Sequence, residues 1–275
     1  MLNINSQVDI VIIGDSRDGH DVLKKIASTR PSIKIAFISR EFKLATTRDY
    51  LNVEYIKDEV IYTDYKNRLF GVYLKNGDRI YCTHLIIASG LAYEPFVIGH
   101  KLVPSVYNNA DDIAKIAKNN PAVVLCEKNS DVRFALAVAK KYKHVYMCTK
   151  TFDIADLTAA NRKKLRDASN IVVLPNTTIS KVYLVDGQLQ KVDLDNYSTV
   201  TCQAIFVKTA SKPETSFVSN ICGKDANGFL VTSSSGESLL VPKCFAIGAC
   251  AAKTTQKMKA KIIESVLTDF TGGTY

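Results

Sequence analysis

Glycine and serine follow an apolar run near the start of the sequence, at a spacing that suits nucleotide phosphates. Gly14, Ser16 and Gly19 form the pattern G-x-S-x-x-G after residues 8–13, close to the G-x-G-x-x-G of dinucleotide-binding turns. The first glycine would allow a tight turn, the serine would leave room for a pyrophosphate and could bond it, and the last glycine would let a helix pack closely on the strand. Free N–H groups at the start of that helix would attract an anion. The pattern predicts either a working dinucleotide site or a relic of one.

Acidic residues in and beyond this turn complicate the prediction. Asp15 and Asp18 would stand next to a phosphate and repel it. The acid that holds a ribose hydroxyl is expected about 20 residues beyond the glycines, and Glu41 stands near that distance. Ser39 occupies the strand-end position that is more usual for such an acid. Two interpretations of Glu41 therefore stay open: it is the ribose ligand, or it is an exposed loop charge.

The elements that would position these residues alternate between strand and helix. Residues 8–13 and 33–39 are apolar runs, typical of strands buried on both faces of a parallel sheet. Between them, residues 22–28 carry apolar side chains at helical spacing, and Pro31 ends the helix. Together these runs predict one βαβ unit.

A second βαβ unit is predicted further along the chain. Residues 122–126 and 144–148 are apolar strands, and residues 131–142 between them have a helical pattern. Further strands and helices are predicted at residues 53–56, 59–64, 69–74, 79–82, 85–88, 159–168, 170–174, 204–208, 244–247 and 257–270. The two units lie about 110 residues apart, which predicts two related nucleotide-binding folds rather than a short-period repeat.

Three further segments carry a specific resemblance to known proteins. Residues 85–95 read LIIASGLAYEP, residues 207–215 read VKTASKPET, and GFLV at 228–231 is followed by VPKCFAIG at 241–248. In the same order, they resemble the segments I-I-A-T-G-x-x-P, G-x-x-P-N-T and G-x-I-x-V … V-P-G-I-F-A-A-G-D of the thioredoxin reductase-like family of FAD- and NAD(P)-dependent pyridine nucleotide-disulfide oxidoreductases. Because these segments span nearly the whole chain, it resembles a divergent member of that family.

The resemblance implies an α/β fold with two Rossmann-like, three-layer ββα domains, the second inserted into the first. An FAD-binding-like domain would comprise residues 1–105 and 218–275, and an NAD(P)-binding-like domain would comprise residues 106–217. FAD would lie along the first glycine turn, with its ribose at the end of the second strand, its adenine against the backbone of Val60, and its pyrophosphate and ribityl chain near two later glycines. The residues implied are Gly14, Asp15, Ser16, Gly19, Ser39, Arg40, Glu41, Val60, Ala88, Ser89, Gly90, Gly248 and Ala249.

The cysteines depart from the family pattern. None of the seven is spaced C-x-x-C, and residues 106–112, where the redox pair would fall, read VYNNADD. Since reduction of a disulfide by a thiolate needs a resolving thiol nearby, we do not expect dithiol chemistry. Most of the cysteines lie in apolar runs, which is typical of buried, reduced thiols. Cys250 would stand near a flavin, but a lone cysteine in such a run is more often part of the packing.

The loop of the second βαβ unit argues against NAD(P) binding in the inserted domain. It follows residues 122–126 and contains no glycine, and its Glu127 and Asp131 would repel a pyrophosphate. Residues 129–131 are good helix caps, so the loop is expected to be capped by its own side chains. Lys150, after the return strand, could still meet a 2′-phosphate.

Two departures weaken the expected FAD site. The aspartate that the family places after the last glycine is missing, because Gly248 is followed by Ala249 and Cys250. The span at residues 40–52 is shorter than in the family, so only residues 45–48 could reach a flavin ring. Each loss removes contacts, and FAD remains the cofactor that the resemblance implies.

The net charge of +9 is spread over many lysines. It indicates solvated helix faces, or attraction to an acidic partner such as a small electron carrier or another protein. Nucleic acid is not expected, because no binding motif accompanies the charge, and no Cys/His cluster has the spacing of a metal site. No apolar run approaches the roughly 20 residues that span a bilayer, and the first residues lack the pattern of a signal peptide. We therefore expect a cytoplasmic protein without a membrane segment.

Two hypotheses about function remain. The first is an FAD-binding flavoprotein that acts as an oxidoreductase without dithiol chemistry and with a degenerate NAD(P) site; the flavin would carry the chemistry and the protein would position it. The alternative is a non-catalytic relative that is retained as a structural or protein-binding subunit. No residue is a convincing acid, base or nucleophile, so no catalytic residue is assigned. We expect a homo-oligomer, such as a homodimer, in either case.

Overall fold

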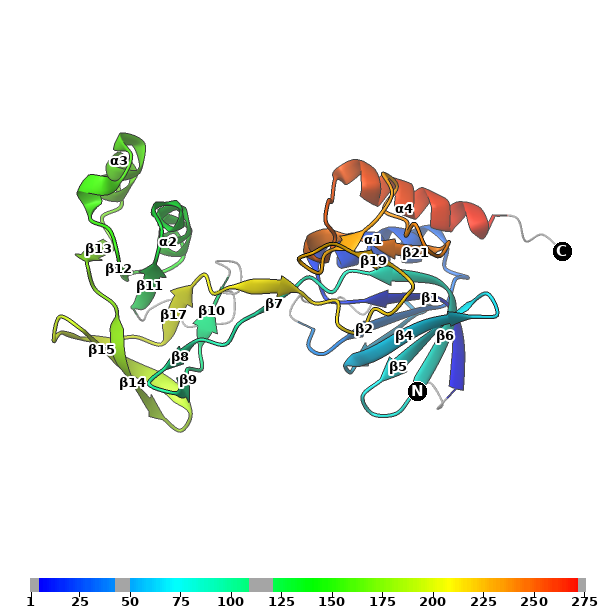
Figure 1. Ribbon diagram of the computed structural model, residues 1–275, viewed down its shortest axis with the longest axis horizontal. Helices are drawn as coiled ribbons and strands as arrows, with labels where there is room; N and C mark the ends of the chain where they lie inside the picture. Colours follow the sequence, from blue (N-terminus) through cyan, green and yellow to red (C-terminus); the bar gives the residue numbers. More distant parts are fainter. Residues whose placement is uncertain (1–4, 43–49, 109–120, 272–275) are drawn as a thin grey trace. The chain divides into compact units, whose positions relative to one another are not determined.

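The computed structural model describes residues 5–42, 50–108 and 121–271 of the chain. The chain divides into two compact units: unit 1 comprises Met1–Ala92 and Ser211–Tyr275, and unit 2 comprises Tyr93–Ala210. The two passages of chain between them, β7 (Leu91–Tyr93) and β18 (Ser211–Pro213), pair with each other (Figure 1). Unit 2 is therefore inserted into unit 1.

The unit boundaries fall earlier along the chain than the expected 105/106 and 217/218. Val103 is buried in a core of unit 2, so residues before 106 already belong to that unit. Phe217 is buried in a core of unit 1, and its carbonyl accepts hydrogen bonds from the N–H and the hydroxyl of Thr63. Partners that lie far away in the sequence place these boundaries, which is why the local pattern did not reveal them.

Among the described residues, unit 1 is built on a seven-stranded sheet with the order β3-β2-β1-β6-β5-β4, and β21 pairs with β6. The bounds are β1 Asn5–Ile13, β2 Ile35–Ser39, β3 Val53–Lys57, β4 Val60–Lys66, β5 Leu69–Leu74, β6 Arg79–Ile87 and β21 Cys244–Ala246, and a small separate pair is formed by β19 Gly223–Lys224 and β20 Leu230–Val231. β1, β2, β3, β6 and β21 run parallel, whereas β4 and β5 are an antiparallel extension. The carboxyl ends of the parallel strands consequently meet at one edge of the sheet.

Alternate side chains of β1 pack into two cores, one on each face of this sheet. On one face they meet α1 (Arg17–Thr29) and α4 (Gln256–Asp269), which lie on the same side of the sheet in Figure 1. On the other face they meet residues 217–230. Burial on both faces explains the continuous apolar run of this strand.

Unit 2 has a parallel sheet with the order β10-β17-β11-β12-β13 and a separate antiparallel sheet with the order β14-β15-β16. The helices α2 and α3 pack on one face of the parallel sheet, and the antiparallel sheet packs on the other. The bounds are β8 Val97–Ile98, β9 Lys101–Leu102, β10 Val106–Tyr107, β11 Ala122–Cys126, α2 Val132–Ala139, β12 Val145–Thr149, α3 Ala159–Asp167, β13 Ile171–Pro175, β14 Ile179–Val185, β15 Gln188–Leu194, β16 Thr199–Thr201 and β17 Ala204–Val207. The predicted α/β class is confirmed.

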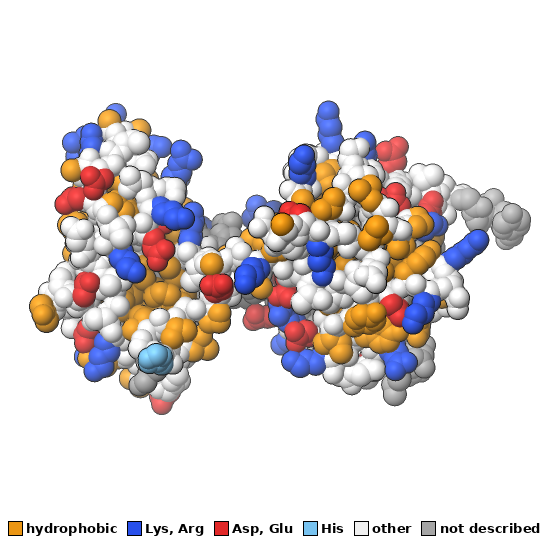
Figure 2. Space-filling view, in the orientation of Figure 1, with side chains coloured by type: hydrophobic (Ala, Val, Ile, Leu, Met, Phe, Trp, Pro, Cys, Tyr) orange, Lys and Arg blue, Asp and Glu red, His pale blue; other side chains and the backbone are white. Residues whose placement is uncertain are grey.

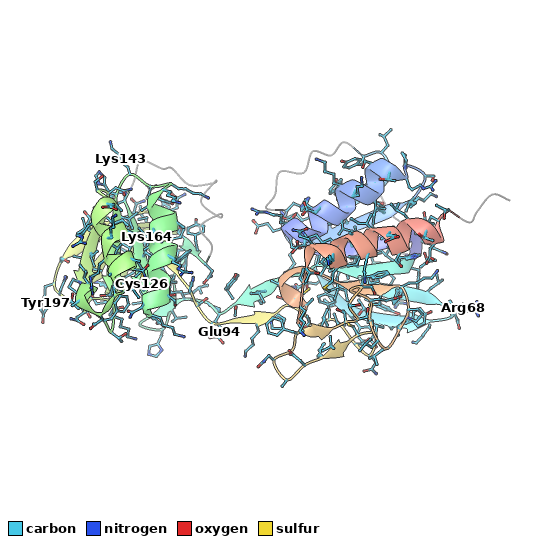
Figure 3. All side chains as sticks on the ribbon, turned by 90° about the horizontal axis from the view of Figure 1, so that it is seen from above. Arg68, Glu94, Cys126, Lys143, Lys164 and Tyr197 are labelled. Carbon is cyan, nitrogen blue, oxygen red and sulfur yellow. The ribbon has the colours of Figure 1, made fainter. Side chains whose placement is uncertain are left out.

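The surfaces of both units mix charged and apolar side chains. Lys and Arg side chains are spread over the faces that Figure 2 shows rather than gathered on one element. Lys143 and Lys164 are both exposed on unit 2 (Figure 3). Within the described ranges, no helix is long and apolar enough to cross a membrane. The same residues contain no group of three or more His, Cys, Asp or Glu side chains placed to hold a metal ion.

Candidate functional site

A glycine turn connects β1 to α1 at the carboxyl edge of the unit 1 sheet. Gly14 has a φ of +107°, and a Cβ atom built on it would lie 2.5 Å from Ser89 Cα, closer than real atoms approach. The Gly14 N–H donates to Ile38 O at 2.8 Å, and the Ala88 N–H donates to Ile13 O at 2.7 Å. Since the turn is hydrogen-bonded on one side and packed against backbone on the other, only glycine fits at this position.

Helix α1 starts immediately after this turn. Ser16 has extended backbone angles, and its Oγ accepts a hydrogen bond from the Gly19 N–H at 3.1 Å, so it is the N-cap. The hydroxyl that we expected to face a phosphate therefore already satisfies one free N–H group of the helix. A Cβ atom on Gly19 would lie 3.0 Å from Ala88 Cβ, which shows how closely the helix packs on the end of β6.

The two aspartates beside the turn are both engaged by basic side chains. Asp15 Oδ1 contacts His20 Nε2, and Asp18 Oδ1 pairs with Lys259 Nζ. Lys259 comes from α4 and also pairs with Asp21 at 2.9 Å. Hydrogen bonds from Asp18 and then Asp21 raise the pKa of Lys259 above its ordinary value. The ammonium group of Lys259 therefore offsets part of the repulsion that Asp18 would exert on a phosphate.

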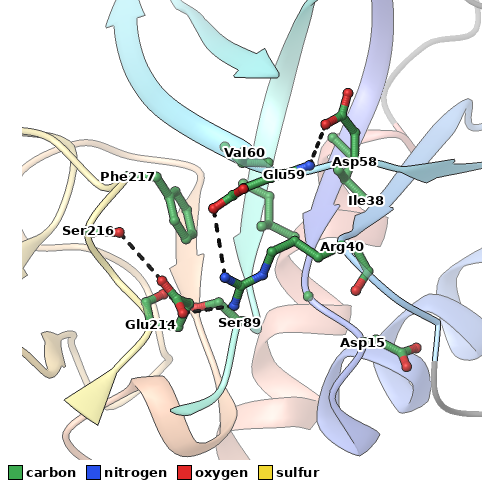
Figure 4. Close-up of a pocket in the computed structure, with 13 residues that line it drawn as sticks. Asp15, Ile38, Arg40, Asp58, Glu59, Val60, Ser89, Glu214, Ser216 and Phe217 are labelled. Atoms are coloured by element: carbon green, nitrogen blue, oxygen red, sulfur yellow. Dashed lines mark hydrogen bonds and ion pairs between the residues drawn. The ribbon is translucent and has the colours of Figure 1, made fainter. Parts of the chain in front are cut away.

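A pocket of about 90 Å³ opens at the carboxyl ends of β1 and β2 (Figure 4). Ile13, Ile38 and Phe217 line it with apolar surface, and Ser39 and Arg40 contribute polar groups. Its volume is below the roughly 300–1,000 Å³ of pockets that enclose a whole small molecule. The pocket therefore suits a base or a sugar of a larger ligand rather than an entire dinucleotide.

Arg40 extends across this pocket between two carboxylates (Figure 4). Its Nη2 donates to Glu214 Oε2 at 2.8 Å, and its Nη1 lies 3.8 Å from Glu59 Oε1. Glu59 Oε2 also pairs with Lys75 at 3.0 Å. The hydrogen bond from Lys75, together with the charges of Lys75 and Arg40, holds the pKa of Glu59 below its ordinary value. The pocket is thus lined by an ionised network.

The structure brings many of the expected FAD residues to this edge of the sheet. The residues that line the pocket are Gly14, Asp15, Ser39, Arg40, Val60 and Ser89. The residues beside the turn are Ser16, Gly19, Ala88 and Gly248. The carbonyl of Gly90 accepts a hydrogen bond from the N–H of Glu214. Glu41 is exposed and does not line the pocket; its carbonyl accepts from Ser39 Oγ at 2.9 Å. Ala249 is exposed. Residues 45–48, which were expected near a flavin ring, lie outside the described residues.

Sequence reasoning found Asp15 but missed the other acidic residues that line the pocket, which are Asp58, Glu59 and Glu214. Glu59 directly precedes Val60, which was expected at the adenine. Its position next to Val60 could therefore have identified Glu59 from the sequence. Glu214 lies in the 207–215 segment of the family resemblance, and the resemblance places that segment in the inserted domain. Only the return of the chain through β18 brings it to the pocket.

The last glycine segment of unit 1 is closed by its own side chains. The Gly248 N–H donates to Thr254 Oγ1 at 3.0 Å, and a Cβ on Gly248 would lie 3.1 Å from Asp18 Oδ2. Cys250 is fully buried, with its thiol 3.3 Å from Ile247 O, and burial raises the pKa of this thiol. Cys250 is therefore packed in the core, where burial disfavours the thiolate form.

In unit 2, the loop after β11 is occupied by an internal carboxylate. Asp131 is buried, and its Oδ2 accepts hydrogen bonds from the N–H groups of Glu127 at 3.2 Å and Lys128 at 3.0 Å. The Glu127 carbonyl accepts from Thr151 Oγ1 at 3.1 Å. A pyrophosphate would need these same amides. Lys150, the expected contact of a 2′-phosphate, is exposed, and its N–H donates to Cys126 O at 3.3 Å.

The model of a family described as pyridine nucleotide-disulphide oxidoreductase matches residues 23–248, which is most of the sequence. The chain belongs to the pyridine nucleotide-disulphide oxidoreductase family. No curated protein matches the sequence at a significant level.

Solved structures of thioredoxin reductases share the fold. The thioredoxin reductase of Streptococcus pyogenes MGAS5005 is 17% identical, with a TM-score of 0.62 over 96% of this chain and 98% of that chain. The enzyme of T. acidophilum is 15% identical, with a TM-score of 0.65 over 97% and 99% of the two chains. The Lactococcus lactis enzyme is 16% identical, with a TM-score of 0.64 over 95% and 98%. At these identities the likeness establishes the fold of this family member. Its reaction has to be inferred from its own residues.

Proposed function

We propose that this family member binds FAD through unit 1 and works as a flavoprotein oxidoreductase without dithiol chemistry. The observation that carries the proposal is the Gly14 turn, packed against the end of β6 beside a pocket at the carboxyl ends of β1 and β2. In open α/β sheets, ligands bind outside the carboxyl ends of the strands, where the strand order reverses. The strand order β3-β2-β1-β6 reverses beside β1.

The residues of unit 1 fit the adenosine end of FAD. Ile38 and Phe217 offer apolar surface for a base, and Ser39, Arg40 and Glu214 offer polar groups for a sugar. The bare backbone at Gly14 leaves room for phosphate oxygens to approach, which is the usual role of the first glycine in such turns. When bound, FAD would supply hydride or electron transfer, and the chain's own residues would hold and orient it.

Dithiol chemistry does not suit the cysteines of this chain. All seven are buried and free. Burial raises the pKa of Cys126, Cys148 and Cys202 to about 12, so these thiols stay protonated at neutral pH. Because the thiolate is the nucleophile in disulfide exchange, electrons from a flavin would have to leave by another route than a thiol pair.

The nicotinamide loop also argues for a different source of electrons. In unit 2, the carboxylate of Asp131 occupies the amides of Glu127 and Lys128, and it would repel a pyrophosphate. We infer that unit 2 does not hold NAD(P) in the usual way. An acidic electron carrier, attracted by the net charge of +9, is the donor that these features favour.

A second candidate function is a non-catalytic subunit that keeps the fold for structure or protein binding. The internal occupation of the unit 2 loop by Asp131 favours it, as does the replacement of the family aspartate after Gly248 by Ala249. The two candidates differ in one measurable property, which is whether a flavin is bound.

The deciding experiment is an absorbance spectrum of the purified protein, before and after incubation with FAD and removal of free cofactor. We expect the visible band of an oxidised flavin to remain with the protein, and mass spectrometry of the released cofactor to identify FAD. A colourless protein that takes up no FAD would remove the flavoprotein proposal. Conversely, steady oxidation of a reduced donor with an artificial acceptor would remove the non-catalytic alternative.

A further inference from the structure

The ribose of an adenine dinucleotide needs an acceptor for its hydroxyls, and the expected acceptor is missing from its usual place. Ser39 ends β2, where a carboxylate is usual. Glu41 is exposed and does not line the pocket. Carboxylates nevertheless reach the pocket from elements further along the chain (Figure 4).

Of the two glutamates beside Arg40, Glu59 has less capacity for a ligand. Its Oε2 pairs with Lys75 at 3.0 Å, and its Oε1 faces Arg40 at 3.8 Å. The Glu59 backbone is also fixed, since its N–H donates to Asp58 Oδ1 at 2.6 Å and its carbonyl accepts from the Lys75 N–H. Both oxygens of Glu59 therefore have basic neighbours from the protein itself.

The backbone of Glu214 is fixed by hydrogen bonds, and one oxygen of its carboxylate makes only a long contact. Its N–H donates to Gly90 O at 3.0 Å, and its carbonyl accepts from Ser89 Oγ at 2.6 Å, so its backbone is fastened to the end of β6. Arg40 Nη2 binds Oε2 at 2.8 Å. Within the described part of the chain, the partner found for Oε1 is Ser216 Oγ at 3.5 Å, which is the limit of a hydrogen bond. The side chain is about one-fifth exposed, so a ligand can reach it.

We propose that Glu214 is the carboxylate that accepts hydrogen bonds from the ribose hydroxyls of the bound nucleotide, and that Arg40 is its positioning residue. The inference rests on the proposed function, because it names the acceptor at the same site. The ligand class is an adenine nucleotide whose ribose carries free 2′- and 3′-hydroxyls, as FAD and ADP do.

The charges around the pocket define what this site excludes. Among the described residues that line it, Asp15, Asp58, Glu59 and Glu214 face one guanidinium, that of Arg40. A 2′-phosphate would add about two negative charges among these carboxylates, and like charges at such short range repel strongly. The site therefore rejects 2′-phosphorylated nucleotides, and it also loses affinity for a nucleotide that lacks the 2′-hydroxyl.

Calorimetric titration of the full chain, freed of cofactor, with three nucleotides tests the inference. ADP represents the adenosine half of FAD, and 2′-deoxy-ADP and adenosine 2′-phosphate 5′-diphosphate keep the 5′-diphosphate and change only the ribose. We expect 2′-deoxy-ADP to bind about tenfold or more weakly than ADP, the loss expected for one charge-assisted hydrogen bond. Adenosine 2′-phosphate 5′-diphosphate should bind more weakly still.

Glu214→Gln and Glu41→Gln are the matched variants. Glu214→Gln should weaken ADP and bring ADP and 2′-deoxy-ADP close to equal affinity, whereas Glu41→Gln should leave both affinities unchanged. Arg40→Gln should reduce the ADP to 2′-deoxy-ADP ratio, and Arg40→Lys should restore part of it. A merely structural role would lower both affinities without changing this ratio.

The outcomes separate this inference from the proposed function. If neither FAD nor ADP binds, both fail together. If ADP binds but wild type does not distinguish it from 2′-deoxy-ADP, or prefers the 2′-phosphate, the role of Glu214 is wrong while FAD binding stands. The wild-type comparison decides even if Glu214→Gln fails to fold.

Discussion

Gly14 shows how a single residue holds the candidate site together. Its positive φ and the approach of the Ala88–Ser89 backbone both require the absence of a side chain. Gly77 offers a natural comparison, because its φ of +97° is similar but nothing lies within 4 Å of a Cβ built there. A substitution at Gly77 therefore meets only the strain of a positive φ, whereas a substitution at Gly14 meets this strain and a steric conflict with the backbone.

We predict that Gly14→Ala destabilises the protein more than Gly77→Ala does. Both variants place alanine at positive φ, at a cost on the order of 1–3 kcal/mol, but Gly14→Ala also forces a methyl group against backbone, which adds roughly 1–3 kcal/mol. Urea unfolding of the two variants measures the difference. Equal losses would show that the backbone around Gly14 yields without resistance.

The ribose acceptor illustrates what residue spacing can and cannot predict. Spacing pointed to the end of β2, and Ser39 and Arg40 do line the pocket there. Glu41 could not be distinguished from an exposed loop charge by spacing alone. Glu214 was out of reach of such reasoning, because it is 174 residues away from the arginine that binds it.

At the scale of elements, the final helix of unit 1 is fastened at both ends. Lys259 near its start pairs with Asp18 and Asp21 of α1. At its end, Asp269 Oδ2 pairs with Lys243 at 2.9 Å and meets the buried His84 Nε2 at 3.0 Å. The hydrogen bond from Lys243, followed by that from His84, holds the pKa of Asp269 below its ordinary value.

His84 makes the anchoring of α4 dependent on pH. Desolvation by burial lowers the pKa of His84, although Asp269 acts in the opposite direction. Burial is the larger effect, since the side chain is only 2% exposed. As the pH falls below about 6.5, the unfolded chain takes up a proton that folded His84 resists, so this group contributes a loss of stability with acidification.

We predict that the free energy of unfolding falls less between neutral pH and about pH 5 in His84→Gln than in the wild type. The reason is that the variant has no imidazole at this position to protonate in the unfolded chain. Thermal or denaturant unfolding at a series of pH values measures this slope. His144→Gln, at an exposed histidine, is the control and should keep the wild-type slope. A steeper slope for His84→Gln would mean that His84 is charged in the folded protein.

At the scale of the whole molecule, this family member keeps the two-unit architecture and lacks the dithiol. Its seven cysteines are distributed over both units, and all are buried. The amides of the unit 2 loop are held by Asp131, so one of the two nucleotide-binding folds is internally satisfied. Unit 1, by contrast, offers a lined pocket at the expected edge of its sheet.

We predict that the native protein is inert to thiol reagents. Buried thiols with raised pKa values present no thiolate, so a colorimetric thiol reagent should find almost no reactive group in the folded protein and seven after unfolding. Treatment with NADPH should not change the native count. Two additional thiols after reduction would reveal a redox-active disulfide and contradict the absence of dithiol chemistry.

The sequence by itself determined the local frame of this protein. Apolar runs, the glycine turn and the family-like segments predicted the α/β class, the βαβ units and the turn at Gly14–Gly19, because these depend on residues close together in the chain. It also showed the lack of a C-x-x-C pair and of glycine in the second loop.

Only the tertiary structure decided which groups meet across the chain. It placed Glu214 against Arg40, buried Phe217 in unit 1, and paired Lys259 with Asp18. It also showed that Asp131 binds the loop amides. From the sequence we expected Asp131 to repel a pyrophosphate and residues 129–131 to cap the helix, but the particular amides that Asp131 binds were not predicted. The physical reason is that the contacts of Glu214, Phe217 and Lys259 join segments far apart in the sequence, and spacing along the chain carries no record of how those segments pack. The contacts of Asp131 are local, with partners three and four residues away, and depend on the backbone conformation of the loop.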